Sequence, residues 1–171
     1  MEERFTDAQI ADFLRRSYFV VDGLWFVKTE EAHGIQEAME LDEAVWDVMC
    51  KVQARKAKSL LAIENGGPAE LGRAFQLKFV AEGYAFDADI REEEARLTVR
   101  VCPWFEILRS SNRTHIAEVI ADRICAREYA GWAREFGPGI EVVFERRLCV
   151  EGCETCSIVF RKVVDAESSS G

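Results

Sequence analysis

The residues of this chain best suited to chemistry are its cysteines. Five of the six lie after residue 100, namely Cys102, Cys125, Cys149, Cys153 and Cys156, and only Cys50 lies elsewhere. Thiolates bind zinc, hold iron–sulfur clusters and take part in disulfide exchange. In a chain expected to stay in a reducing compartment, this concentration favours metal or redox chemistry over structural disulfides. Unrelated buried thiols are the third interpretation, because free cysteine packs well in a core.

The elements that position the first half of the chain are predicted to be helices. A capping box at Thr6-Asp7-Ala8-Gln9 begins the first helix, which is expected to bend or break at Asp22-Gly23. A second helix is expected from about Asp42 to the turn residues 64–68, and a shorter one over residues 69–78.

The second half of the chain predicts strands around a long helix. Residues 84–90 and 97–101 alternate apolar and polar side chains, which predicts a hairpin turning through residues 92–94. A helix is expected over residues 114–136, capped at Thr114, and strands over residues 140–148 and 157–164. The predicted fold is therefore α+β, with N-terminal helices and an antiparallel sheet of about four strands, two hairpins around a long helix. It forms a single domain over residues 1–164, followed by a disordered tail over 165–171.

This arrangement suggests how distant cysteines come together. Cys102 ends the first hairpin, Cys125 lies within the long helix, Cys149 closes the third strand, and Cys156 opens the fourth. The ends of such elements can converge at one edge of an α+β domain. Four thiolates in a closed tetrahedral site suit zinc, and thiolates also suit an iron–sulfur cluster.

The stretch over residues 125–160 resembles the C-terminal half of the 4-vinyl reductase domain superfamily. The matching positions are Cys125, Gly131 with Trp132, Glu145, Cys149, Gly152 and Cys156. In the aromatic-sensing regulators of that superfamily, such cysteines and the glutamate hold a structural zinc beside a buried small-molecule pocket. Here Glu145 lies four residues before Cys149 rather than three, which departs from the pattern of the superfamily.

Residues 15–162 also resemble a family of short cytoplasmic proteins related to L-2-amino-thiazoline-4-carboxylic acid hydrolase. The resemblance rests on Asp22-Gly23-x-Trp25-Phe26, Ala44-Val45-Trp46, Cys102-Pro103, Cys125, Cys149 and Cys156-x3-Phe160. Taken together, the two resemblances imply four metal ligands, Cys102, Cys125, Cys149 and Cys156. Cys153 is the predicted substitute if one of the four is not a ligand. The resemblance also suggests a ligand pocket at Asp22, Trp25 and Trp46, although a tryptophan more often belongs to the core.

Composition and charge limit the class of partner. The chain has 171 residues, 49% of them hydrophobic, so it needs no metal merely to provide a core. Its net charge of −9 disfavours nucleic acid as a partner. The longest apolar stretch, around residues 18–27, is interrupted by Asp22 and is too short to span a bilayer. With no apolar signal-peptide core at the N-terminus, a cytoplasmic location is expected.

The expected function is that of a cytoplasmic domain that binds zinc and also binds a small molecule or a protein partner, with a homodimer as one form of partner. Two alternatives stay open: a small hydrolase of the amino-thiazoline carboxylate type, and an iron–sulfur or thiol redox protein. The sequence contains no G-x-S-x-G elbow, no P-loop and no H-E-x-x-H motif, so no catalytic residue is predicted.

Overall fold

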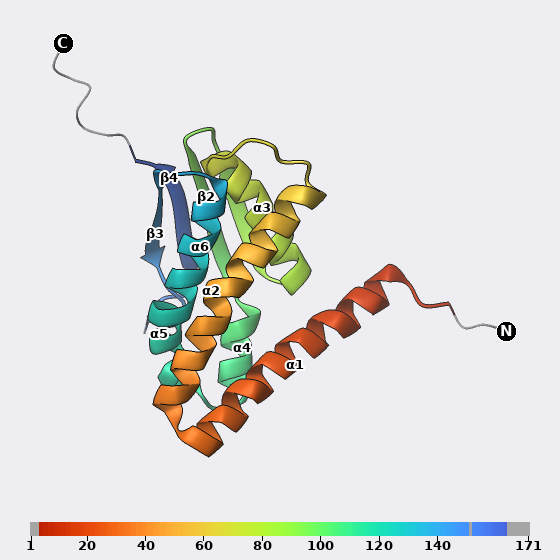
Figure 1. The fold of residues 1–171 in the computed structure, drawn as a ribbon, viewed down its shortest axis with the longest axis vertical. Helices are drawn as coiled ribbons and strands as arrows, with labels where there is room; N and C mark the ends of the chain where they lie inside the picture. The colour runs from red at the N-terminus through yellow and green to blue at the C-terminus, as the bar shows by residue number, and fades with distance from the viewer. Residues whose placement is uncertain (1–3, 151, 164–171) are drawn as a thin grey trace, which may run out of the picture. The chain divides into compact units, whose positions relative to one another are not determined.

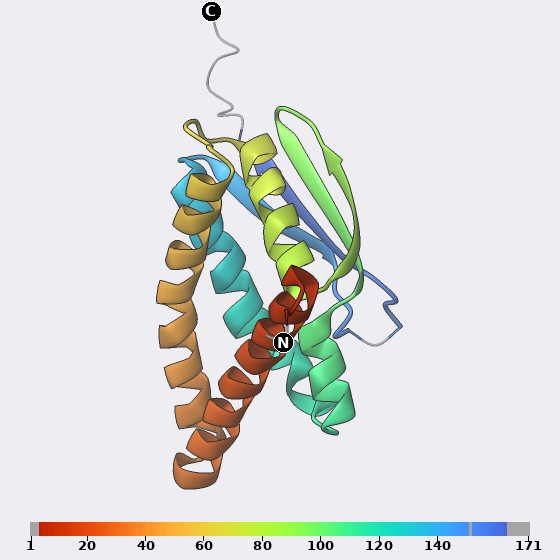
Figure 2. The same cartoon turned by 90° about the vertical axis from the view of Figure 1, so that its right-hand side faces the viewer.

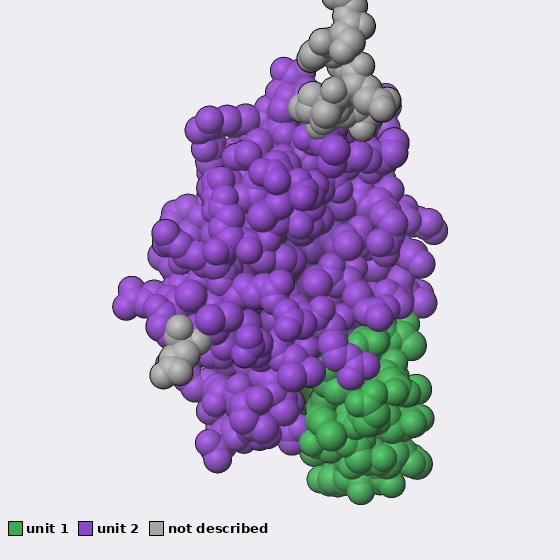
Figure 3. Space-filling model, turned by 90° about the vertical axis from the view of Figure 1, so that its left-hand side faces the viewer, with its two compact units in different colours: residues 1–45 green, residues 46–171 purple. Residues whose placement is uncertain are grey.

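The computed structural model describes residues 4–150 and 152–163. The chain divides into two compact units, residues 1–45 and residues 46–171 (Figure 3). The tail expected over residues 165–171 lies outside the described residues. The single domain expected over residues 1–164 stays a prediction.

Unit 1 consists of α1 (Asp7–His33) and the first part of α2 (Ile35–Leu60). The predicted capping box is confirmed, because the Gln9 amide donates to Thr6 Oγ1 at 3.2 Å and the Thr6 amide donates to Gln9 Oε1 at 2.8 Å. Gly34 alone joins the two helices, with φ of 89°, and its amide donates to the Glu30 carbonyl at 2.8 Å. Glycine adopts this conformation without the strain that a Cβ would add.

Two predictions for this region are wrong. α1 runs unbroken through Asp22 and Gly23, because one glycine inside a helix costs only about 1 kcal/mol. α2 begins at Ile35 rather than near Asp42, because the chain turns at Gly34.

Apolar side chains are exposed along much of α1. Among the described residues of unit 1, only Phe19, Ala38 and Met39 are buried hydrophobic side chains. The exposed large ones on α1 are Ile10, Phe13, Leu14, Val20, Val21, Leu24 and Trp25. An apolar stripe of this length is typical of a surface that contacts another apolar surface. Of the described helices, none combines the length and the apolar content that a membrane span requires.

Unit 2 contains a sheet and the helices that pack on it. After the remainder of α2 come α3 (Pro68–Glu82), β1 (Ala85–Ile90), β2 (Glu94–Val101) and α4 (Pro103–Ser110). A helical segment over residues 114–136 leads to β3 (Ile140–Arg146) and β4 (Cys156–Lys162). The four strands form one antiparallel sheet in the order β1-β2-β4-β3. The predicted α+β class and the two hairpins are therefore confirmed.

The helical segment over residues 114–136 changes its winding. A 3₁₀ turn (Thr114–Ile116) leads into a short α-helix, α5 (Ala117–Ile120), then a π-helical turn (Ala121–Cys125), and finally α6 (Ala126–Phe136). Thr114 opens the 3₁₀ turn, and its side chain does not cap the segment as predicted. π-helical turns are rare and frequently lie at functional sites, and this one ends on Cys125.

Both α3 and α6 pack on one face of the sheet (Figures 1 and 2). Gly72 allows α3 its close approach, since a Cβ there would lie 2.5 Å from the Ala95 Cβ. Between helices and sheet lies a core rich in aromatic rings, in which the Phe75 ring contacts those of Tyr129, Trp132 and Phe160 at centroid distances of 4.7–4.9 Å. At one end of the strands, the partly buried Cys102, Cys125 and Cys156 pack against this core.

Candidate functional site

Three of the predicted ligands converge at one end of the sheet. Cys102 directly follows β2 and precedes α4, Cys125 ends the π-helical turn, and Cys156 begins β4. In the β2–β4 ladder, Cys156 pairs with Val99, which lies three residues before Cys102. The start of β4 is therefore close to Cys102. All three thiols pack against the same hydrophobic core.

The thiols of this cluster influence one another electrostatically. Burial is the main reason that the pKa of Cys125 lies well above its ordinary value, and the neighbouring Glu128, Cys102 and Cys156 raise it further. Burial, together with Cys102 and Cys149, raises the pKa of Cys156 to about 12. The four cysteines Cys102, Cys125, Cys149 and Cys156, called here the thiol cluster, therefore share one electrostatic neighbourhood in which thiolates are disfavoured.

Several neighbours of Cys102 favour its thiolate. Burial raises its pKa, but several neighbours act in the opposite direction. They are the backbone amides of Trp104 and Phe105 in the first turn of α4, the Tyr84 hydroxyl and the Lys78 ammonium. Helix N-termini and lysines lower thiol pKa values in reactive cysteines, and both lie beside Cys102.

The turn between β3 and β4 carries Cys149 and Cys153. Burial raises the pKa of Cys149, while Arg147 lowers it and the carboxylates of Glu118 and Asp122 raise it. Cys149 therefore lies near the helical segment on which Cys125 lies, as does Arg147, which pairs with Asp122. Cys153 is half-buried, and its amide donates to the Val150 carbonyl at 3.1 Å. All six cysteines lie within the described residues and are free thiols.

The thiol cluster is not arranged as a metal site. Within residues 4–150 and 152–163, no three side chains of His, Cys, Asp or Glu are placed to hold a metal ion. A zinc ion would require the thiols to move closer together and to release their protons. Both the zinc site and the iron–sulfur alternative stay predictions.

Glu145, which the superfamily resemblance matched to a metal ligand, contacts other partners. Its carboxylate accepts from Ser157 Oγ at 3.2 Å and forms an ion pair with Arg96. Along β4 neighbouring side chains point to opposite faces of the sheet, so the Ser157 partner places Glu145 on the face opposite Cys156. The register of β3 against β4 shifts between Phe144 and Arg146, beside this position.

Beside the thiol cluster lies a buried group of charges that the sequence did not predict. The Lys78 Nζ lies 2.8 Å from Glu82 Oε2 and 3.1 Å from Glu128 Oε1, and all three side chains are less than a tenth exposed. Trp104 Nε1 donates to Glu82 Oε2 at 3.3 Å. We call Lys78, Glu82 and Glu128 the charge cluster. It joins α3 to α6 and carries one more negative than positive charge.

Burial alone would lower the pKa of Lys78, but Glu128 and Glu82 outweigh this effect and raise it, so the amine stays an ammonium. The rings of Tyr84 and Tyr129 complete this neighbourhood, and burial raises the pKa of both hydroxyls. The sequence held one indication, since Lys78 and Glu82 stand four residues apart within the apolar run of residues 75–84. Glu128 is distant in sequence and gave none.

The predicted pocket residues lie in different surroundings. Trp25 of unit 1 is 72% exposed, whereas Trp46 of unit 2 is 5% exposed and meets the Trp104 ring edge-on at 5.7 Å. Asp22 lies on α1 and is half-buried. Trp46 is thus a core residue, and a ligand pocket that involves Asp22 and Trp25 stays a prediction.

Comparison with known proteins identifies a family. No curated protein and no solved structure matches this chain. The resemblances to the 4-vinyl reductase superfamily and to the amino-thiazoline hydrolase relatives therefore stay predictions. A family model matches residues 6–149, from the capping box of α1 to Cys149. The chain belongs to DUF6125, a family of unknown function.

Proposed function

We propose that this protein is a metal-binding domain in which Cys102, Cys125, Cys149 and Cys156 hold one zinc ion. The observation that carries the proposal is the thiol cluster, in which cysteines from four separate segments share one partly buried neighbourhood. Burial and mutual repulsion disfavour thiolates there. The positive charge of a bound divalent cation would offset both effects and stabilise the thiolates. The resemblance of Cys125, Cys149 and Cys156 to the 4-vinyl reductase superfamily supports the same ligand set.

The zinc would be structural. Four thiolates fill a tetrahedral site and leave no position for a reacting water. Such an ion would tie the end of β2 and the start of β4 to the π-helical turn. Zinc sites of this kind release about 10–16 kcal/mol on binding in zinc-finger peptides, so even a fraction of this value would dominate the stability of unit 2. A small molecule or a protein, including a second copy of this chain, is the proposed partner, and the cytoplasm is the proposed location.

The decisive experiment measures metal in the protein purified without oxygen. About one zinc per chain is expected, with no visible absorbance. The Cys156→Ser variant should lose the metal, whereas the Cys153→Ser variant, altered in the same turn, should keep it. Metal-free protein with reduced thiols, whose Tm a chelator does not change, would contradict the proposal. Brown absorbance from a thiolate-bound iron centre would replace zinc by the iron–sulfur alternative.

A second candidate is a hydrolase of the amino-thiazoline carboxylate type. The charge cluster favours it, because ionisable groups held in a buried, low-dielectric setting are typical of active sites. Turnover of L-2-amino-thiazoline-4-carboxylate that Glu128→Gln abolishes and Glu135→Gln preserves would support this candidate. Glu135 is a suitable control since it lies on the same helix and pairs with Arg55 instead. Absence of turnover by the unaltered protein would exclude it.

A further inference from the structure

α1 carries apolar side chains on two faces. The apolar stripe, which runs from Ile10 to Trp25, is exposed, and its members fall within about 140° of the helix circumference at 3.6 residues per turn. Phe19, which is buried, and Phe26, which is half-buried, lie on the opposite face. A helix that is apolar on both sides is ordinarily buried on both sides. The exposed face of α1 therefore suits a further apolar surface that covers it.

The apolar stripe is nearly symmetric about Ser17. Six of its members form three pairs at equal distances along the chain from this residue, namely Leu14 with Val20, Phe13 with Val21, and Ile10 with Leu24. When two such helices run antiparallel and cross at Ser17, each apolar residue of one copy meets an apolar residue of the other. This is the self-complementary contact that a two-fold axis requires.

Ser17 suits the centre of such a contact. Its side chain is small, so it allows two helices to approach closely. Its hydroxyl donates to the Phe13 carbonyl of the same helix at 2.8 Å, so it can leave water without losing its hydrogen bond. No charged residue shares this face of α1 between Ile10 and Trp25. The centre of the stripe therefore carries no charge that burial would leave unpaired.

The charges at the two ends of the stripe favour the antiparallel direction. Asp7 precedes the stripe by about one helical turn, and Lys28, whose Nζ lies 2.6 Å from Glu31 Oε2, follows it by about one turn. Asp7 stands ten residues before Ser17 and Lys28 eleven after it. Antiparallel helices crossing at Ser17 thus place Asp7 of each copy near Lys28 of the other, whereas parallel helices place like charges together.

An interface of ordinary size is within reach of this helix. Phe13 and Trp25 are each more than 70% exposed, and an aromatic side chain buries about 150–250 Å², so these two can remove about 200–350 Å² from water. The five aliphatic members, each about half exposed, add to this area. Stable interfaces bury about 800 Å² per partner, and α1, with 27 residues, is about 40 Å long.

Charge makes a lipid surface a poorer occupant of the stripe. Helices that lie on anionic bilayers carry mainly lysine and arginine on their polar face. In α1 the acidic residues outnumber the basic ones, with Asp7, Asp12, Asp22, Glu30 and Glu31 against Arg15, Arg16 and Lys28. An anionic bilayer would repel this helix, and a lipid surface gives no reason for the symmetry about Ser17.

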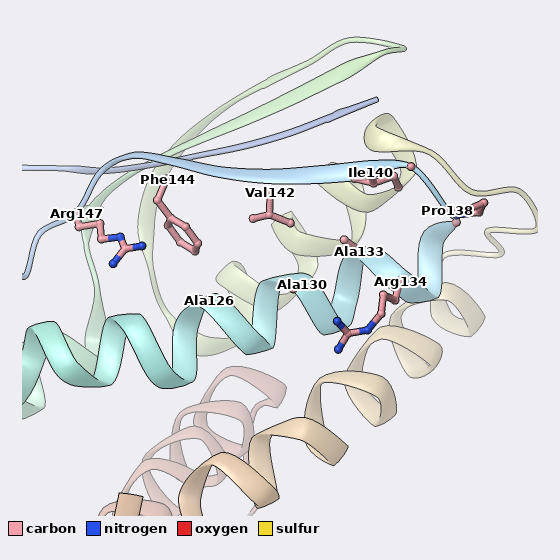
Figure 4. Close-up of a pocket in the computed structure, with 11 residues that line it drawn as sticks. Ala126, Ala130, Ala133, Arg134, Pro138, Ile140, Val142, Phe144 and Arg147 are labelled. Atoms are coloured by element: carbon pink, nitrogen blue, oxygen red, sulfur yellow. The ribbon is translucent and has the colours of Figure 1, made fainter. Parts of the chain in front are cut away.

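The hollow between α6 and the edge strand β3 offers less selectivity than the stripe (Figure 4). Its volume is about 480 Å³, and Ala130, Val142 and Phe144 are among the residues that line it. Of its two arginines, Arg147 pairs with Asp122 and Arg134 points away from β3. No charge shown there selects a ligand.

We propose that the apolar stripe of α1 binds the same stripe of a second copy of this chain, antiparallel, with the two Ser17 residues at the two-fold axis. This inference specifies how the second copy named above as a partner binds, and it rests on that part of the proposed function alone. Zinc in the thiol cluster does not enter the contact. The failure of either proposal is therefore visible separately, in metal content or in mass.

Sedimentation equilibrium over a series of protein concentrations tests the association. The unaltered protein should reach twice the mass of one chain. Val21→Glu places a carboxylate opposite Phe13 of the other copy, so it should raise the dimer Kd at least about tenfold, while its zinc content should equal that of the unaltered protein. Val80→Glu is the matched control, because Val80 is equally exposed but lies on α3, and it should leave the Kd unchanged. Far-UV circular dichroism confirms that both variants fold.

Disulfide crosslinking tests the direction and the register. Ser17→Cys should form a disulfide between two copies, because a residue at the two-fold axis meets itself. Ile10→Cys should not crosslink to itself, because the two copies of residue 10 stand about 20 Å apart, but it should crosslink to Leu24→Cys when the two variants are mixed. Mass spectrometry of the unreduced digest identifies each linked pair and separates it from the native thiols.

Three outcomes would overturn the proposal. They are a single-chain mass at every concentration, a Val21→Glu variant that dimerises as tightly as the unaltered protein, and self-crosslinking of Ile10→Cys as efficient as that of Ser17→Cys. Single-chain protein that co-sediments with phosphatidylserine-containing vesicles, and loses this binding in Val21→Glu, would assign the stripe to a lipid surface instead.

Discussion

At the scale of single residues, Gly131 shows how closely α2 and α6 pack. A Cβ at this position would lie 2.2 Å from the Cys50 Sγ and 3.1 Å from its Cβ. Cys50 is 1% exposed, so neither its side chain nor the helix has free space into which to move. Cys50 is thus a packing residue, unlike the cysteines of the thiol cluster.

Gly131→Ala should therefore destabilise the protein by about 1–3 kcal/mol, the usual effect of overpacking a core. Urea unfolding followed by circular dichroism measures this change. The double variant Gly131→Ala with Cys50→Ala removes the sulfur that the new methyl group meets, so it should regain most of the loss. Equal stability of the single variant and the unaltered protein would mean that the helices are farther apart than described.

The sequence predicted the thiol cluster better than it predicted the charge cluster, for a physical reason. Cysteines are rare, and their positions at the ends of predicted strands indicated that they meet. Lysine and glutamate are common surface residues, so Lys78 and Glu128 attract no notice until the fold buries them. Their burial is set by the packing of α3 on α6, which no local pattern reports.

At the scale of elements, the charge cluster is the polar link between α3 and α6. Lys78 Nζ is the cation that two buried carboxylates share. Removing one partner of a buried ion pair leaves an uncompensated charge, which typically destabilises by about 3–5 kcal/mol. Replacing the whole group with uncharged side chains of similar volume is often close to neutral.

Lys78→Met should accordingly destabilise the protein by about 3–5 kcal/mol in chemical unfolding. The triple variant with Glu82→Gln and Glu128→Gln as well should recover much of this loss, because no net charge stays buried. Lys56→Met is the comparison at an exposed lysine of α2, and it should change stability by less than about 1 kcal/mol. A triple variant less stable than Lys78→Met would show that the hydrogen bonds of the group matter more than its charge.

Elements with a clear period were predicted correctly, and elements without one were not. The alternation over residues 84–90 and 97–101 predicted β1 and β2, although β2 begins at Glu94, within the turn that was expected over residues 92–94. The sequence analysis does not predict α4, because Cys102-Pro103 indicates the end of a strand, although proline also suits the first turn of a helix. The sequence does not predict the π-helical turn, because no residue type within Ala121–Cys125 distinguishes it from an ordinary helical turn.

At the scale of the whole molecule, the core is distributed unequally between the two units. The large cluster of buried aromatic and aliphatic residues lies entirely in unit 2. Unit 1 contributes few buried hydrophobic side chains among the described residues and exposes Phe13 to 71%. Segments with little buried apolar surface open at lower free energy than the core.

Amide hydrogen exchange followed by mass spectrometry should therefore show at least about tenfold faster exchange in α1 than in α3 and α6. Measuring at two protein concentrations provides the control. Equal protection of α1 and α3 would contradict this prediction. If that protection rises with concentration, a second copy covers the apolar stripe of α1, as expected for a homodimer.

The π-helical turn at Ala121–Cys125 has a consequence for how this segment tolerates change. Each residue added to or taken from an α-helix rotates everything beyond it by about 100° around the axis. The additional residue in this turn therefore sets the phase between the residues before it and α6 after it. Substitutions within the turn preserve that phase, whereas an insertion or deletion of one residue redirects Cys125, Glu128 and Tyr129 together. The length of this short segment, more than its composition, therefore sets the directions in which Cys125 and Glu128 point.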